Sequence, residues 1–175
     1  MRSSCRRLYR WSYGRAINRI LIWPTHRSRR NWGSQALAKT AAVNAKGAFW
    51  FATYKGGMSA DLFVAMLKQI MRRRRKPLFL VIDSLPAHKA KLVRDYVETT
   101  NGKLKLYFLP GYAPELNPDE LVWSHMKRTG TAKRPLASNE LLQDRIEADL
   151  INIQNNRALV RSFFKAPDVA YIADG

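Results

Sequence analysis

Cysteine is almost absent from this sequence: of 175 residues, only Cys5 is a cysteine. A single thiol excludes a disulfide framework and a cysteine-rich zinc site, and it suits a reducing compartment. Long apolar runs are also missing, since no stretch approaches the ~18 apolar residues of a membrane span. Arg15 and Arg19 interrupt the apolar residues near Met1, which excludes a secretory signal peptide. We therefore expect a cytoplasmic protein with no membrane partner.

Acidic residues are few and unevenly placed. Lys and Arg number 31 against 13 Asp and Glu, which gives a formal net charge of +18. The first acidic residue is Asp61, whereas the first sixty positions carry twelve Lys or Arg. Such a surface attracts polyanions, so we expect a nucleic-acid partner and a place on the nucleoid. An organelle transit peptide is the alternative for the basic start, although its helical apolar face is poorly formed.

The length corresponds to about one domain. Residues 1–38 show no sustained period and form a basic leader of unassigned role, apart from a short strand expected at Ile20–Trp23. Later patterns predict, in order, a hairpin of Lys39–Asn44 with Ala48–Tyr54, a helix Ala60–Arg73, a strand Leu78–Ile82, a helix His88–Glu98, a strand Lys105–Leu109, a helix Pro118–Arg128, a helix capped by Ser138 that ends at Asn155, and a short helix Leu159–Phe164. This order is that of an α/β domain.

Two carboxylates follow strands in this layout. Asp83 comes directly after the apolar run Leu78–Ile82, and Glu120 lies in the first turn of the helix after the next strand. Because catalytic groups gather where parallel strands end, we expect both carboxylates at one end of the sheet. Together with the basic charge they fit a site for Mg²⁺ and chemistry on phosphodiesters. The structural alternatives are a turn role for Asp83 and, for Glu120, a capping box with Asn117.

Zinc held by histidine is a rival metal site, through Asp83, His88, Glu120 and His125. Its geometry fails, because Glu120 and His125 are about 140° apart around a helix, whereas a helical ligand pair needs a spacing of three or four residues. The sequence also contains no Ser-His-Asp motif, glycine-rich phosphate loop or nucleotide-binding fingerprint. Mg²⁺, with Mn²⁺ as a substitute, is therefore the expected cofactor.

The segments around both carboxylates resemble a known family. They read Val81-Ile82-Asp83-Ser84-Leu85-Pro86-Ala87-His88 and, later, Phe108-Leu109-Pro110-Gly111-Tyr112-Ala113-Pro114-Glu115-Leu116-Asn117-Pro118-Asp119-Glu120-Leu121-Val122-Trp123. With 36 residues between Asp83 and Glu120, they are similar to the catalytic core of DDE transposases of the mariner-like superfamily, in its bacterial insertion-sequence branch. The resemblance covers about Thr40 to Arg128.

This resemblance implies an RNase H-like fold over residues 39–175, a mixed sheet flanked by helices, with Asp83 and Glu120 as two of three metal ligands. It implies that His88 and Asn117 support the site. The implied partner is DNA, as transposon ends and target, and the intact protein is expected to form a homodimer. We expect phosphate contacts from Arg72, Arg73, Lys89, Lys91, Lys127 and Arg128.

Two positions depart from the family pattern. Ser84 stands where the family usually has Asn, a change that leaves the ligand Asp83 intact. The first catalytic Asp of the family ends the central strand before the hairpin, but no Asp or Glu precedes Asp61 here. We therefore expect a partial domain that lacks its first central strand, unless the apolar run Ile20–Trp23 fills that position, from a truncated or decayed reading frame without activity. The leader resembles no helix-turn-helix domain.

Two other functions stay open. One is another RNase H-like nuclease that cuts without strand transfer, and the other is a basic DNA-binding remnant with no activity. The proline-rich loop Pro110–Pro118 favours the transposase, because it belongs to the matching motif, whereas the missing Asp favours the remnant.

Overall fold

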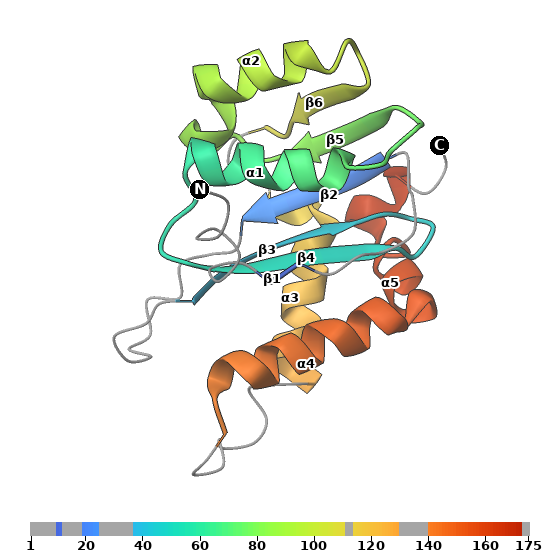
Figure 1. Cartoon of the computed structure of the whole chain (residues 1–175). Coiled ribbons are helices and arrows are strands. Elements are labelled where there is room, and N and C mark those ends of the chain that lie inside the picture. The colour runs from blue at the N-terminus through green and yellow to red at the C-terminus, as the bar shows by residue number, and fades with distance from the viewer. Residues whose placement is uncertain (1–9, 12–18, 25–36, 111–113, 130–139, 173–175) are drawn as a thin grey trace.

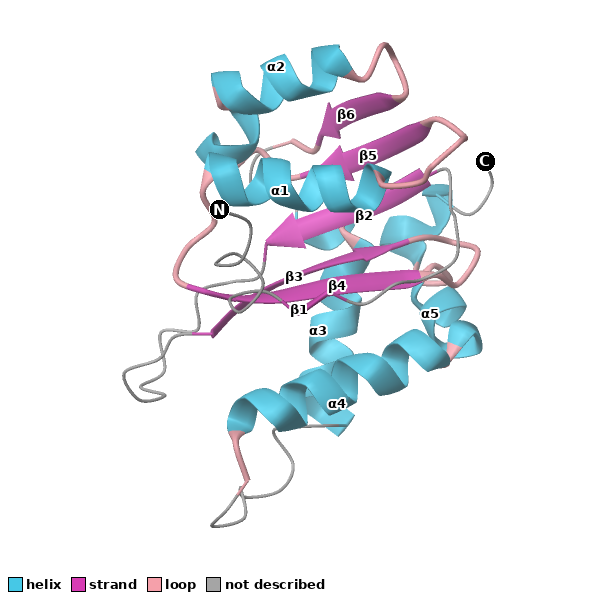
Figure 2. Cartoon of the chain, in the orientation of Figure 1, coloured by secondary structure: helices cyan, strands magenta, loops and turns pink. Residues whose placement is uncertain are grey.

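The computed structural model describes residues 10–11, 19–24, 37–110, 114–129 and 140–172. They form one sheet with helices on both faces (Figure 1, Figure 2). The strands lie in the order β1 (Arg10–Trp11), β4 (Phe49–Lys55), β3 (Leu37–Val43), β2 (Arg19–Pro24), β5 (Leu78–Ile82) and β6 (Leu104–Phe108). The pairs β1–β4, β4–β3 and β3–β2 are antiparallel. The pairs β2–β5 and β5–β6 are parallel. The predicted mixed α/β layout is confirmed.

Two apolar layers fill the space between the sheet and its helices. One face packs against α1 (Ala60–Met71) and α2 (Lys91–Thr99), through residues such as Phe63 and Leu80. The other face packs against α3 (Pro118–Thr129), α4 (Leu142–Asn155) and α5 (Arg157–Phe163), through residues such as Phe51 and Leu150. The alternation of strand residues between the two layers follows from the strand period of two, as Ala41 and Ala42 show. Among the described helices, none has the length and apolarity needed to cross a membrane.

β2 lies at the centre of the sheet. It pairs antiparallel with β3 and parallel with β5, where Ile22 is opposite Ile82. The prediction that the domain lacks its first central strand is therefore wrong, whereas the short strand expected at Ile20–Trp23 is confirmed. An unbroken apolar run is typical of a strand in a parallel pairing, which is why this segment fills the position. The leader thus contributes to the same sheet as the later strands.

Helix boundaries differ from prediction at two places. The helix expected at His88–Glu98 is divided into a 3₁₀ turn, η1 (Pro86–Lys89), and α2, because Ala90 between them has an extended ψ of 150°. The helix expected to be capped by Ser138 begins instead at Leu142, and Ser138 lies outside the described residues. The other predicted helices and strands are confirmed to within a few residues.

The parallel strands give the sheet two chemically different ends. β2, β5 and β6 all finish at one end, which we call the carboxyl end. β5 and β6 begin at the opposite end, which we call the distal end, and the turn between β3 and β4 also lies there because β3 runs antiparallel to β2 (Figure 1). Asp83 follows β5 at the carboxyl end.

Candidate active site

Asp83 is oriented through one of its two carboxylate oxygens. Its side chain is 10% exposed. Oδ1 accepts a 3.4 Å hydrogen bond from the Leu85 backbone N–H and lies 2.5 Å from His88 Nδ1. Oδ2 has no hydrogen-bond partner among the described residues. The bond from Leu85 is the turn role expected of such a residue, and it leaves the second oxygen available to a ligand.

His88 is fixed by packing as well as by Asp83. Its side chain is fully buried, and its ring centroid lies 4.1 Å from that of Phe63 in α1. Nδ1 faces Asp83, both at the carboxylate and at the backbone oxygen 3.4 Å away. Nε2 is buried and has no hydrogen-bond partner in the described part of the chain. This geometry supports a role for His88 in orienting the carboxylate.

Ser84 links the ends of β5 and β6. Its Oγ donates a 3.0 Å hydrogen bond to the Leu109 carbonyl oxygen, and the Leu109 N–H donates a 2.7 Å bond to the Ile82 carbonyl oxygen. These two bonds fix the point from which the chain leaves β6 toward the 3₁₀ turn η2 (Pro114–Leu116) and α3. The serine therefore has a structural role at the position where the resembling family has asparagine.

Tyr54 is a neighbour of the site that the sequence did not reveal. It lies in β4 and is 2% exposed. Burial raises the pKa of its phenol to about 12, and the Asp83 charge adds to the increase. The pKa of Tyr54 therefore senses the charge at Asp83. No motif connects the two, because β3 and β2 lie between their strands.

Glu120 lies in the first turn of α3 and is partly exposed. Asn117 precedes the helix. Its Oδ1 accepts a 3.1 Å hydrogen bond from the Asp119 N–H, and its carbonyl oxygen accepts a 3.1 Å hydrogen bond from the Glu120 N–H. The N-cap predicted for Asn117 is thus confirmed. The Glu120 carboxylate makes no hydrogen bond or ion pair with the described residues, so no capping box forms there and this group also remains available.

Asp119 is a buried carboxyl that the sequence reading passed over. It is 0% exposed, and Oδ2 accepts a 2.9 Å hydrogen bond from Trp123 Nε1. Burial raises its pKa well above the usual range, the Trp123 hydrogen bond acts in the opposite sense, and the charge of Glu120 adds a further increase. The spacing of four residues from Trp123 was the available signal, since such residues share a helix face. The hydrogen bond lies within α3, since both residues belong to that helix.

The donor atoms fit a hard divalent cation in kind, since carboxylate oxygens are what Mg²⁺ prefers. The number of donor residues is smaller than the three that a closed metal site would need. The described residues contain no group of three or more His, Cys, Asp and Glu that could hold a metal ion. Asp83 after β5 and Glu120 in the first turn of α3 are the two carboxylates of the predicted donor set.

Of the six predicted phosphate contacts, two lie beside Asp83. Lys89 ends η1, and its Nζ lies 5.4 Å from the centroid of the Phe108 ring. Lys91 begins α2 and forms an exposed ion pair of 2.8 Å with Asp95.

The other four predicted contacts lie elsewhere. Lys127 and Arg128 are exposed in the last turn of α3, two turns beyond Glu120. Arg72 and Arg73 follow α1 and precede β5, which places them at the distal end of the sheet. The six residues therefore do not form one surface around Asp83.

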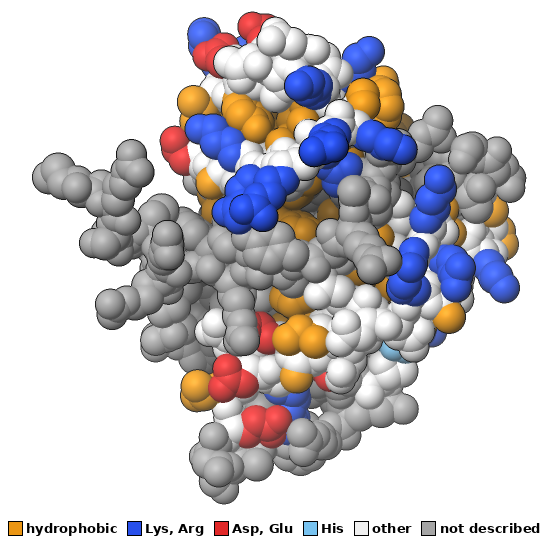
Figure 3. All heavy atoms as spheres, turned by 45° about the vertical axis from the view of Figure 1, so that its right-hand side comes forward, with side chains coloured by type: hydrophobic (Ala, Val, Ile, Leu, Met, Phe, Trp, Pro, Cys, Tyr) orange, Lys and Arg blue, Asp and Glu red, His pale blue; other side chains and the backbone are white. Residues whose placement is uncertain are grey.

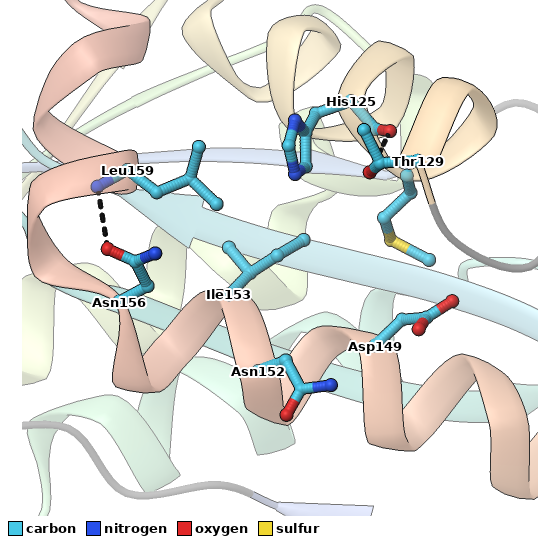
Figure 4. Close-up of a pocket in the computed structure, with 8 residues that line it drawn as sticks. His125, Thr129, Asp149, Asn152, Ile153, Asn156 and Leu159 are labelled. Carbon is cyan, nitrogen blue, oxygen red and sulfur yellow. Dashed lines mark hydrogen bonds between the residues drawn. The ribbon is translucent and has the colours of Figure 1, made fainter.

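His125, a member of the rejected zinc set, faces a different hollow. Its ring lies 5.7 Å from that of Phe163, and its helix, α3, meets α4 and α5 around a hollow of about 230 Å³ (Figure 4). Asp149 and Asn152 line the same hollow from α4. The hollow shares no residue with the carboxyl end, which agrees with the exclusion of His125 from the site.

The class of the domain follows from this arrangement. A central strand joins an antiparallel hairpin to two parallel strands, helices cover both faces, and Asp83 follows β5 at the carboxyl end. This is an RNase H-like domain, as the sequence predicted.

Solved structures of Mos1 transposase share the fold. The Mos1 strand transfer complex has a TM-score of 0.62 and 16% identity, and the match covers 89% of this chain and 55% of that one. The Mos1 catalytic domain with raltegravir and Mg has the same TM-score and identity, with 87% of this chain and 83% of that one covered. The chain thus spans about half the length of Mos1 as found in the strand transfer complex.

The sequence places the chain in a family. The DDE superfamily endonuclease family matches residues 24–143, more than half of the chain, and the chain belongs to this family. No curated protein matches the sequence.

Proposed function

We propose that this chain is the catalytic domain of a DNA transposase from the bacterial insertion-sequence branch, and that Asp83 and Glu120 are its remaining metal ligands. The observation that carries the proposal is the state of Asp83: one oxygen is held by Leu85 and His88 while the other is available at the end of a central strand. Membership of the DDE superfamily endonucleases supports the reaction class. Mos1 structures that contain Mg, Mn or a transposon end support the cofactor and the substrate.

The residues divide the work in a simple way. When bound, Mg²⁺ supplies Lewis-acid stabilisation of the phosphodiester and a more acidic water or 3′-hydroxyl nucleophile. Asp83 and Glu120 would hold the ion through their available oxygens. His88 orients Asp83, and Asn117 fixes the first turn of α3 and with it Glu120. Lys89 and Lys91 bind phosphates of the same DNA.

We further propose that this chain by itself does not cut or join DNA. Two-metal catalysis clamps the attacking and leaving oxygens with ions about 4 Å apart, and a third carboxylate normally holds them. The central strand that would carry this carboxylate is β2, whose sequence Arg-Ile-Leu-Ile-Trp-Pro contains no acidic residue. The chain then acts as a DNA-binding domain with a weakened metal site, and its DNA partner keeps it on the nucleoid. A homodimer on paired DNA ends is the proposed assembly of the intact protein.

Metal binding tests the proposal directly. We expect weak binding of Mn²⁺ by electron paramagnetic resonance, lost in Asp83→Ala and in Glu120→Ala. His125→Ala is the matched control, since this partly buried residue lines the hollow between α3, α4 and α5 and not the carboxyl end of the sheet. Equal Mn²⁺ binding by wild type and Asp83→Ala would contradict the proposed site. A strand-transfer assay on a chain whose missing carboxylate has been restored separates a transposase from a nuclease that only cuts.

One observation favours a second function, a basic DNA-binding remnant that has lost its metal site. The described residues contain no cluster of three metal-ligating side chains. This function predicts tight DNA binding with no Mn²⁺ binding, so the same titration distinguishes it from the transposase domain.

A further inference from the structure

The distal end of the sheet concentrates charge of one sign. Four segments meet there: the β3–β4 turn at 44–48, the α1–β5 loop at 72–77, the α2–β6 turn at 100–103, and residues 157–165 around α5. They contain ten Lys or Arg and no Asp or Glu, although the whole chain has 31 basic and 13 acidic residues. Figure 3 turns this end toward the viewer and shows Lys and Arg side chains spread over it, with Asp and Glu at its margins.

The turn between β3 and β4 is built tightly onto α5. Gly47 has a φ of +83°, and a Cβ at this position would lie 2.6 Å from the Arg157 carbonyl oxygen and 3.1 Å from Arg161 Cγ. Arg157 Nη2 donates a 3.5 Å hydrogen bond to the Lys46 carbonyl oxygen. The turn and the helix therefore form one rigid support for their cations.

The cations on this support are not neutralised by ion pairs with the described residues. Lys46, Arg157, Arg161 and Lys165 are all exposed, and none forms an ion pair with the described residues. Arg157 and Arg161 are four residues apart in α5, so their like charges stand on one side of the helix, and Lys165 follows shortly after the helix ends. Such an arrangement repels itself unless a polyanion covers it.

The α1–β5 loop adds a second group of cations, of which Arg73 is under backbone strain. Arg73 has a φ of 60°, in the left-handed region that favours glycine. At the α2–β6 turn the same region is occupied by Asn101 and Gly102, the residue types that tolerate it. An arginine kept in the unfavourable conformation, beside exposed Arg75 and Lys76, indicates that its charge is used.

These cations are too far from Asp83 to contact a DNA phosphate that is bound beside it. β5 has five residues, so its first and last residues are about 13 Å apart at ~3.3 Å per residue. Across the sheet, β4 and β6 are separated by four strand spacings, or about 19 Å. Duplex DNA carries one charge per ~1.7 Å of axis, so a duplex laid along the distal end presents on the order of ten phosphates to it.

We infer that the distal end is a second DNA-binding surface, which holds the backbone of a duplex segment away from the segment at the carboxyl end. The identification of the polyanion as DNA rests on the proposed function. Phosphate contacts carry no sequence information, so this surface binds duplexes without sequence preference. One chain thereby contacts DNA at both ends of its sheet.

Salt-dependent binding of a 20-bp duplex, followed by fluorescence anisotropy in EDTA, tests the inference. Arg161→Gln removes one distal cation, and Arg94→Gln removes an equally exposed arginine from the middle of α2 as the matched control. We expect the slope of log K against log salt to become shallower by ~0.9 in Arg161→Gln and to stay unchanged in Arg94→Gln. Equal slopes in the two variants would overturn the inference.

Arg73→Gly provides an independent check, because it removes a charge while relieving the backbone strain. We expect its Tm to equal or exceed that of the wild type while its slope becomes shallower. If both variants are folded and neither Arg73→Gly nor Arg161→Gln shows a shallower slope, the inference is overturned.

Two further arms separate this inference from the proposed function and from another partner. Arg161→Gln should retain the Mn²⁺ binding that Asp83→Ala loses, so either claim can fail alone. Poly-glutamate at equal charge concentration should compete poorly with the duplex. Competition as strong as that of unlabelled duplex would assign the distal end to an acidic protein and overturn the DNA assignment.

Discussion

His88 Nδ1 lies 2.5 Å from Asp83 Oδ1 while the His88 ring packs against Phe63, so a single buried side chain joins the carboxyl end of the sheet to the core. We predict that His88→Ala lowers the free energy of unfolding by about 3 kcal/mol, as for other buried rings replaced by alanine. Urea denaturation measures the change. Asp83→Ala should cost less, since its side chain has no ring to remove. A cost below about 1 kcal/mol for His88→Ala would contradict the packing role.

The raised pKa of Tyr54 predicts that the folded protein loses stability in alkali. Its pKa is raised to about 12 in the folded protein, so the folded state holds the phenolic proton more tightly than the unfolded chain does. Its contribution is therefore complete below about pH 10 and is lost as the pH rises toward 12. Urea denaturation at pH 9 and pH 11.5 should show this loss in the wild type and a smaller loss in Tyr54→Phe. An unchanged loss in Tyr54→Phe would assign it to another group.

The same phenol reports on the charge at Asp83. We predict that Asp83→Asn lowers the pKa of Tyr54 but leaves it above 10, because burial is the larger of the two causes. NMR titration of tyrosine labelled at Cζ measures the value, with Tyr54→Phe to assign the signal. A pKa unaffected by Asp83→Asn would show that the two groups do not interact.

DNA binding by the whole chain should be strong, salt-dependent and indifferent to sequence. The formal charge of +18 and the counterions released from phosphates predict a fall of ~0.9 log units in affinity per contact for each tenfold rise in salt. Anisotropy with duplexes of unrelated sequence measures both properties. Binding that ignores salt, or that selects one sequence by more than about a hundredfold, would contradict this expectation.

Asp83 and Glu120 should share one metal. The parallel strands β5 and β6 end together, and the bonds of Ser84 and Leu109 hold the start of the path to α3. In a crystal soaked with Mn²⁺, anomalous scattering should reveal an ion between the two carboxylates. Carboxyl groups more than about 8 Å apart would be too distant to ligate one pair of ions, and the site would be wrong.

The sequence predicts well those elements that local patterns determine. β5 has its predicted bounds because a five-residue apolar run between Pro77 and Asp83 allows few alternatives. α1 begins where Ser59 Oγ accepts from the Leu62 N–H, as its N-cap pattern indicates. Asn117 likewise starts α3. In each case the residues that fix the element are its own neighbours in the chain.

Other features depend on contacts between distant segments. The central position of β2 is set by its pairing with β3 and β5, which the apolar run of the strand does not reveal by itself. The break at Ala90 allows His88 to pack on Phe63, a requirement of the tertiary structure that an alanine does not signal. The coupling of Tyr54 to Asp83 also requires the assembled sheet.

The central claim is that one missing carboxylate in β2 prevents catalysis, and position 23 is where to restore it. Ile22 is opposite Ile82, so the next position is level with Asp83. Trp23 is also the partner of Ala41, which belongs to the layer packed by α3, the helix of Glu120. The strand register therefore makes position 23 the one to change.

Mg²⁺-dependent nicking of supercoiled DNA tests this claim most directly. The wild type and Trp23→Asn should not nick, whereas Trp23→Asp should, and adding Asp83→Ala to Trp23→Asp should abolish the activity. Nicking by the wild type that disappears in Asp83→Ala would contradict the account, because the chain would then already possess its third ligand.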